Sequence, residues 1–215
     1  MLNSTVRSVV RLSVVVLLSV GGILTLTACA TTLTTIEKSC GTGNNINRCS
    51  GTLQVPVNDT ALIRQGAQIA IDRVYSDAFA SEVERFMVAN RASIGSHPDW
   101  VNLTPAGVVS NLRSKMDEAR LGTHDGPGAW YYHYIHDSLA LESTETLPAR
   151  INRWGIPGRS AASIANTIVH EAAHAADLTH NDDHVACAPP YVLGEIIQRL
   201  DNDTPTNMVS HCRWF

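Results

Sequence analysis

The sequence His170-Glu171-Ala172-Ala173-His174 places two histidines and a glutamate within little more than one helical turn. Residues four apart lie on the same face of an α-helix, so both imidazoles would project in one direction. Two neutral imidazoles at this spacing can bind one zinc ion. Glu171 lies about 100° around the helix from His170. Its carboxylate would therefore lie beside the metal, where it can accept a proton from a water on the zinc.

The residues before this motif predict the helix that it needs. Ser160 or Ser163 can cap the helix, and Ile164, Ile168 and Val169 supply an apolar face. The motif is also rich in alanine, which lets neighbouring chain approach the metal closely.

A catalytic zinc site needs a third protein ligand and an open fourth position. His180 follows His174 by six residues, or about 600° on an unbroken helix, so the helix must end between them. The stretch HEAAHAADLTH over residues 170–180 resembles the long metzincin signature, in which a glycine breaks the helix three residues after the second histidine. Asp177 stands at that place, and aspartate tolerates a left-handed backbone. The resemblance implies that zinc is bound by His170, His174 and His180.

Other residues compete with His180 for the third ligand position. Glu195 lies 21 residues after His174, a spacing that resembles the glutamate-liganded zincins. Asp182 or Asp183 could serve as in aspartate-liganded zincins, although the Gly-Thr-x-Asp motif of that group is absent. Asp177 could itself reach the metal.

A wider stretch, residues 149–200, resembles a group of small bacterial zincin-like proteins. In these a strand ending near an asparagine, here Asn152, precedes the metal helix, and a Pro-Tyr-x-x-Gly segment, here residues 190–194, follows it. The resemblance implies an α+β fold, a mostly helical zincin-like domain with a small sheet and an HExxH active-site helix, and it implies peptide hydrolysis. Tyr191 could donate a hydrogen bond to the oxyanion, or it could be a packed ring with its hydroxyl at the surface. The metzincin Met-turn has no clear counterpart, since Met208 is the only methionine after the motif.

The rest of the mature chain is predicted to be a helical scaffold with two strands. Strands are expected over residues 130–136 and 149–156, and the second is a candidate for pairing with an extended substrate. Four helices are expected besides the one that carries the histidine motif. The first follows Asp59-Thr60, with Ile63, Ala67, Ile71 and Val74 inward, and the second covers residues 78–88, with Val83, Phe86 and Met87 inward. The third starts at Thr104-Pro105, with Val108, Leu112 and Met116 inward, and the fourth covers residues 191–200.

The N-terminus is predicted to be an export signal. Arg7 and Arg11 precede 17 uncharged residues, and Leu26-Thr27-Ala28-Cys29 resembles a bacterial lipobox. The resemblance implies cleavage before Cys29 and a lipid on that cysteine, which anchors the protein in the bacterial cell envelope. Because alanine and not aspartate follows Cys29, the usual sorting rule implies the outer membrane in a host with two membranes. The alternative is an uncleaved anchor helix, since 17 residues is near the minimum for crossing a bilayer.

Four further cysteines suggest two disulfides in an exported chain. Three pairings are possible, and sequence proximity favours Cys40–Cys49 and Cys187–Cys212. Free thiols or a cysteine-rich metal site are the alternatives, but no C-x-x-C spacing supports a metal site.

Composition limits the partners and sets the domain plan. The chain has 215 residues and a formal net charge of -4, which argues against a nucleic-acid partner. We expect a signal peptide over residues 1–28, a tether with a small disulfide loop over 29–58 and a zincin-like metallopeptidase domain over 59–215. The predicted function is a lipid-anchored zinc peptidase acting on a peptide or protein. The alternative is a non-catalytic, zinc-stabilised binding or structural lipoprotein.

Overall fold

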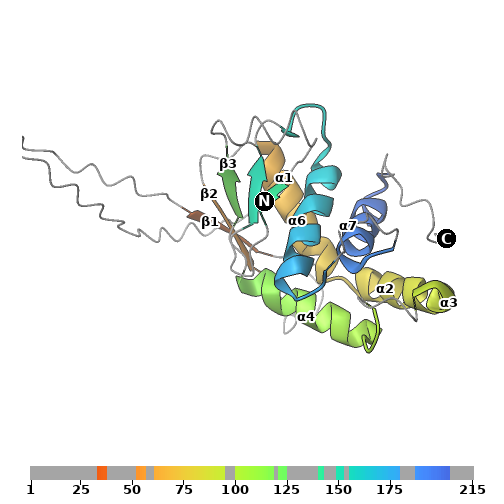
Figure 1. Ribbon diagram of the computed structural model, residues 1–215. Coiled ribbons are helices and arrows are strands. Elements are labelled where there is room, and N and C mark those ends of the chain that lie inside the picture. The colour runs from red at the N-terminus through yellow and green to blue at the C-terminus, as the bar shows by residue number, and fades with distance from the viewer. Residues whose placement is uncertain are drawn as a thin grey trace, which may run out of the picture.

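The computed structural model describes residues 33–37, 52–56, 61–94, 100–118, 121–124, 140–142, 149–152, 155–179 and 187–203. The predicted mostly helical character is confirmed in these residues (Figure 1). The helices are α1 (Ala61–Val74), α2 (Asp77–Ala89), α3 (Arg91–Ile94), α4 (Pro105–Glu118), α6 (Ala161–Ala175) and α7 (Pro189–Leu200). The strands are β1 (Leu33–Glu37), β2 (Thr52–Pro56), β3 (Leu121–His124), β4 (Ala140–Glu142) and β5 (Ala149–Asn152).

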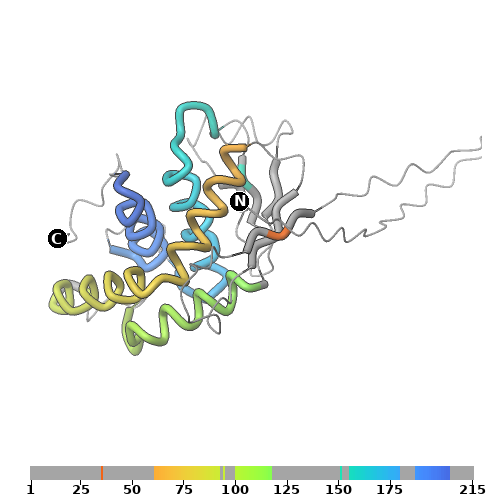
Figure 2. Tube along the Cα trace, turned by 180° about the vertical axis from the view of Figure 1, so that it is seen from behind, coloured from red at the N-terminus to blue at the C-terminus, as the bar shows by residue number. Residues whose placement is uncertain are grey.

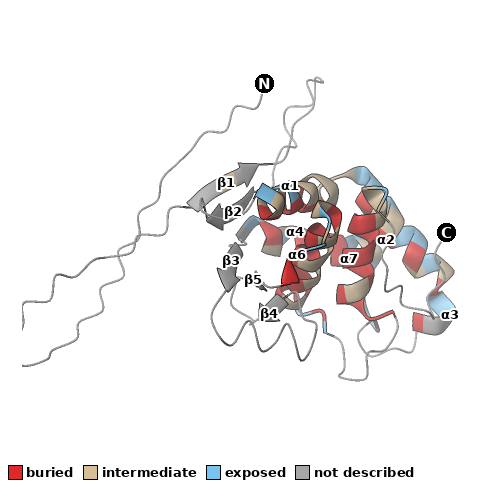
Figure 3. Ribbon diagram, turned by 90° about the horizontal axis from the view of Figure 1, so that it is seen from above, coloured by how far each residue is buried: buried red, intermediate tan, exposed pale blue. Residues whose placement is uncertain are grey.

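Helix α6 lies at the centre of the helical layer, with α1 on one side and α7 on the other. Views from the front and from behind agree on this arrangement (Figures 1 and 2). Seen from above, the buried positions cluster where these helices meet (Figure 3). The helices α1 and α6 approach closely at Gly66, where an added Cβ would lie 2.7 Å from Cγ2 of Ile164. Helix α6, which carries His170 and His174, is therefore enclosed on two sides by packed helices.

The predicted inward positions of α1 and α4 are confirmed. Each of them is at most 1% exposed: Ile63, Ala67, Ile71 and Val74 in α1, and Val108, Leu112 and Met116 in α4. In α2 the predicted Val83 and Phe86 are buried, while Met87 is only partly buried against the core.

Side-chain caps fix where three helices begin. Ser76 accepts a hydrogen bond from the Phe79 N–H at the start of α2, and Thr104 accepts one from the Gly107 N–H at the start of α4. Of the two serines proposed as the cap of α6, Ser160 serves, and its hydroxyl accepts a hydrogen bond from the backbone N–H of Ser163.

The strands form two small sheets. Strands β1 and β2 pair antiparallel, and β5 lies between β3, which is parallel to it, and β4, which is antiparallel. Because β5 is hydrogen-bonded on both sides, the expectation that this strand pairs with a substrate is wrong. The strand is also shorter than predicted: it ends at Asn152, and Pro157 and Gly158 form a turn, with Gly158 at a φ of 83°. The strand expected over residues 130–136 lies outside the described residues.

Two strands occur within the stretch predicted to be a tether. Strands β1 and β2 both contact α1, and β2 also contacts α4 and β3. The predicted signal peptide and lipidation site at Cys29 lie outside the described residues. Within the described part of the chain, no helix is long and apolar enough to cross a membrane.

Candidate metal centre

The structure brings His170 and His174 together on one face of α6. Both side chains are partly buried, and their rings meet edge to face with centroids 4.9 Å apart. Their Nε2 atoms lie 3.2 Å from each other. Two ligands bound at 2.0–2.1 Å to a tetrahedral zinc are about 3.3 Å apart. The two nitrogens therefore have the separation of neighbouring ligands on one ion.

The other ring nitrogen of His174 sets the tautomer of that side chain. Nδ1 of His174 lies 3.0 Å from the carbonyl oxygen of Leu178. A carbonyl oxygen can only accept, so Nδ1 donates the hydrogen and Nε2 carries a lone pair, the form that a metal needs. Leu178 thus orients the histidine through its backbone.

The end of α6 supplies that carbonyl. The helix ends at Ala175, and Asp177 has a φ of 60°, which confirms the predicted left-handed stop at this residue. The Asp177 N–H donates to the His174 carbonyl, and the Leu178 N–H donates to the Ala173 carbonyl, both at 3.0 Å. This pair of hydrogen bonds defines a Schellman motif, and the left-handed residue reverses the chain so that Leu178 returns to the helix.

Glu171 and Tyr191 complete the described part of the site. Glu171 is 9% exposed in the middle of α6. The Tyr191 ring, from α7, lies edge to face against His170 with the centroids 4.6 Å apart. Burial, and to a lesser degree the nearby negative charge of Glu171, raise the pKa of the Tyr191 phenol above 10.0.

Antiparallel packing of α7 on α6 explains why Tyr191 reaches this place. The helices touch at Gly194, where an added Cβ would lie 2.7 Å from the carbonyl oxygen of Asn166. The hydroxyl of Ser160, at the start of α6, donates to the carboxylate of Asp203, which follows the end of α7. Moving toward the C-terminus of α6 therefore means moving toward the N-terminus of α7, which sets Tyr191 level with His170.

The third ligand is not assigned by the described residues. Among them, no group of three His, Cys, Asp or Glu side chains is placed to bind a metal ion. Glu195 and Asp177 belong to the described residues, and neither of them forms such a group with His170 and His174. Glu195 lies four residues, about 6 Å of helix, beyond Tyr191 along α7. His180, Asp182 and Asp183 lie outside the described residues.

The predicted disulfides are only partly visible. Cys187 is disulfide-bonded, and its partner lies outside the described residues, so the pairing with Cys212 stays a prediction. Cys40 and Cys49 are also outside.

Sequence reasoning missed three residues that support this site. The Leu178 carbonyl orients His174, Asn111 of α4 donates its amide to the Ala176 carbonyl at 3.3 Å, and Trp100 donates its indole N–H to the Cys187 carbonyl. Only Trp100 had a sequence signal, as a large aromatic residue just before a helix cap.

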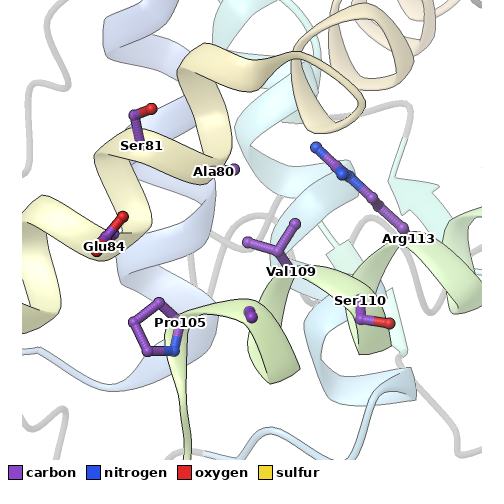
Figure 4. A pocket seen from close by; sticks show the side chains of 8 residues that line it. Ala80, Ser81, Glu84, Pro105, Val109, Ser110 and Arg113 are labelled. Carbon is purple, nitrogen blue, oxygen red and sulfur yellow. The ribbon is translucent and has the colours of Figure 1, made fainter. Parts of the chain in front are cut away.

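A cleft of about 420 Å³ lies between α2 and α4 (Figure 4). Arg113 lines it, but its guanidinium donates to the carbonyls of Val74 and Ser76 and so stabilises the end of α1. None of the residues of the candidate metal centre lines this cleft, so the cleft is a separate feature. The lining residues are Ala80, Ser81, Glu84, Pro105, Ala106, Val109, Ser110 and Arg113.

No protein-family model, curated protein or solved structure matches this chain significantly. Its function is therefore inferred from the residues and geometry of the site.

Proposed function

We propose that this chain is a zinc-dependent peptidase with a zincin-like α+β fold, and that His170, His174 and His180 bind the metal. The observation that carries the proposal is the 3.2 Å separation of the two Nε2 atoms on one helix face. The buried Glu171 beside them in the same helix adds the group that hydrolysis requires. The substrate is a peptide or a protein, and a lipid on Cys29 anchors the chain to the bacterial envelope.

In this mechanism Glu171 moves the protons. Zinc, when bound, supplies a Lewis acid that polarises the scissile carbonyl and lowers the pKa of water to about 7. Glu171 accepts a proton from the attacking water and passes it to the nitrogen of the leaving amine. Its place next to His170 in the helix keeps the carboxylate beside the metal site without making it a ligand.

Tyr191 is the proposed hydrogen-bond donor to the substrate. Its raised pKa keeps the phenol protonated at neutral pH, so the hydroxyl can donate. A donor that faces the carbonyl oxygen stabilises the negative charge that develops there during attack. The contact between its ring and His170 holds it next to the metal ligands.

A non-catalytic, zinc-stabilised lipoprotein would use the two histidines but would need neither Glu171 nor Tyr191. The proposed test therefore separates metal binding from turnover. In the full chain purified in detergent, Glu171→Gln should retain zinc and lose hydrolysis by about 10²–10⁴-fold or more, because a carboxamide cannot accept the proton. His174→Ala, the matched control, should lose zinc. Metal content would be measured by mass spectrometry and cleavage with a peptide library. A Glu171→Gln variant that cleaves as fast as the wild type would refute the peptidase mechanism.

A further inference from the structure

Trp100 connects the loop before α4 to Cys187, the residue before the N-cap of α7. Its side chain is 3% exposed, and its indole N–H donates to the carbonyl of Cys187, 87 positions away in sequence. The ring also packs near Phe86 of α2, with centroids 6.0 Å apart. A buried indole N–H needs an acceptor, and here the acceptor is a carbonyl of the backbone that leads into α7.

Cys187 has an unusual backbone conformation. Its φ is 80°, in the left-handed region that residues with a Cβ rarely adopt. Such a conformation persists only where its surroundings hold it. At Cys187 the described constraints are the disulfide and the hydrogen bond from Trp100. The following residue, Ala188, is the N-cap of α7 and makes no side-chain cap hydrogen bond.

The backbone between Cys187 and Tyr191 is stiff. Pro189 and Pro190 occupy the first positions of α7, and each fixes its own φ near -65°. A change in the direction of the chain at Cys187 is therefore transmitted to the first turn of the helix. Tyr191 lies in that turn, with its ring against His170.

We infer that Trp100 is a positioning residue for Tyr191. By holding the carbonyl of Cys187, Trp100 sets the direction in which α7 starts and so keeps the tyrosine ring beside His170. The consequence for catalysis rests on the proposed function, whereas the consequence for the position of the ring does not.

The first experiment measures the ring position without turnover. The full chain is labelled with 3-fluorotyrosine, and the Tyr191 fluorine signal is assigned by its loss in Tyr191→Phe. Trp100→Phe keeps an aromatic ring and removes the donor, so the Tyr191 signal should shift or broaden while the signal of Tyr75, which directly follows α1, stays unchanged. The matched control is Phe79→Leu, which removes a buried ring of α2 and should leave the Tyr191 signal in place. An unmoved Tyr191 signal in Trp100→Phe would overturn the inference.

The second experiment is a double-mutant cycle on peptide hydrolysis. A 1 Å displacement of a catalytic group can lower the rate by about 10²-fold, so Trp100→Phe should lower kcat about 10-fold or more with little change in KM. In a Tyr191→Phe background the same substitution should cost little more, because both act through one hydroxyl. Equal losses in the two backgrounds would show that Trp100 acts only through general stability and would overturn the inference. If the wild type does not hydrolyse any peptide, the proposed function fails while the fluorine measurement still tests the placement of Tyr191.

A third measurement applies if Trp100→Phe does not fold. In the wild-type chain at low urea, hydrogen exchange of the Trp100 indole N–H and the Tyr191 fluorine signal should change together. Changes at different urea concentrations would mean that the two residues are not linked, and would overturn the inference.

Discussion

Asp177 offers the sharpest test of how helix α6 ends. It has a φ of 60°, and its side chain is exposed, so substitutions there act mainly through the backbone conformation. We consider three replacements. Glycine adopts this conformation without strain, asparagine tolerates it as aspartate does but carries no charge, and valine is β-branched and disfavours it.

The expected magnitudes follow from the left-handed backbone. Holding an L-residue in this region costs about 1–2 kcal/mol, and glycine removes that cost while losing about 0.5–1 kcal/mol in chain entropy. Asp177→Gly should therefore be neutral or stabilising by about 1 kcal/mol. Asp177→Asn should be slightly stabilising, since a negative charge at a helix C-terminus is unfavourable. Asp177→Val should lose about 1–2 kcal/mol relative to asparagine, which is about 2–8 °C in Tm for a chain of this size.

The assay is thermal and urea unfolding of the metal-free chain, followed by a zinc competition titration. The expected order of stability is glycine, then asparagine, then aspartate, then valine. Zinc affinity should fall about 10–100-fold in Asp177→Val, because the same turn brings the Leu178 carbonyl to Nδ1 of His174. If the valine variant matches the asparagine variant in both measurements, the turn at Asp177 does not control either the helix end or the histidine.

Gly194→Ala should lower the unfolding free energy by about 1–3 kcal/mol, because the added Cβ would lie 2.7 Å from the carbonyl oxygen of Asn166. Urea titration measures this loss, and an unchanged unfolding midpoint would contradict the close packing of α6 and α7. Cys212→Ser should lower Tm and zinc affinity more than Cys49→Ser, because the predicted Cys187–Cys212 disulfide closes the longer loop and is worth about 3 kcal/mol. Peptide mapping without reduction would identify the disulfide pairs, and equal effects of the two substitutions would count against the predicted pairing. Cys29→Ser should abolish incorporation of labelled fatty acid, and a variant that retains the label would exclude lipidation at this cysteine.

The helices were predictable wherever an apolar period of three to four residues coincides with a cap. Pro105 begins α4 as expected, because Thr104 supplies the capping oxygen and proline needs no N–H partner in the first turn. The register of α1 was equally predictable, because its buried residues recur at spacings of three and four in the sequence. The start of a helix and its inward face depend on residues that are close together in the sequence, so both can be predicted from one sequence.

The sheet order and the placement of α7 were not predictable in the same way. Whether β5 is an edge strand depends on β3 and β4, which lie elsewhere in the chain. The position of Tyr191 depends on the approach of two helices at Gly194, a contact between residues 28 positions apart. Long-range contacts of this kind leave no local pattern, so the sequence named Tyr191 only through a resemblance.

The end of α6 also favours one of the competing third ligands. The Leu178 carbonyl oxygen is 3.0 Å from Nδ1 of His174, which fixes one point of the chain beside the proposed metal site. Two residues span at most about 7 Å, so the Cα of His180 remains within reach of that point whatever path the chain takes. Asp182 and Asp183 can lie about 14–18 Å from it, and Glu195 is held in α7 one turn away from the level of His170. Of the candidates that follow Leu178, His180 has the shortest stretch of chain to the two helix histidines, and Asp177, which is described, is not grouped with them as a ligand. A left-handed residue at position 177 and a histidine at position 180 therefore belong to one hypothesis.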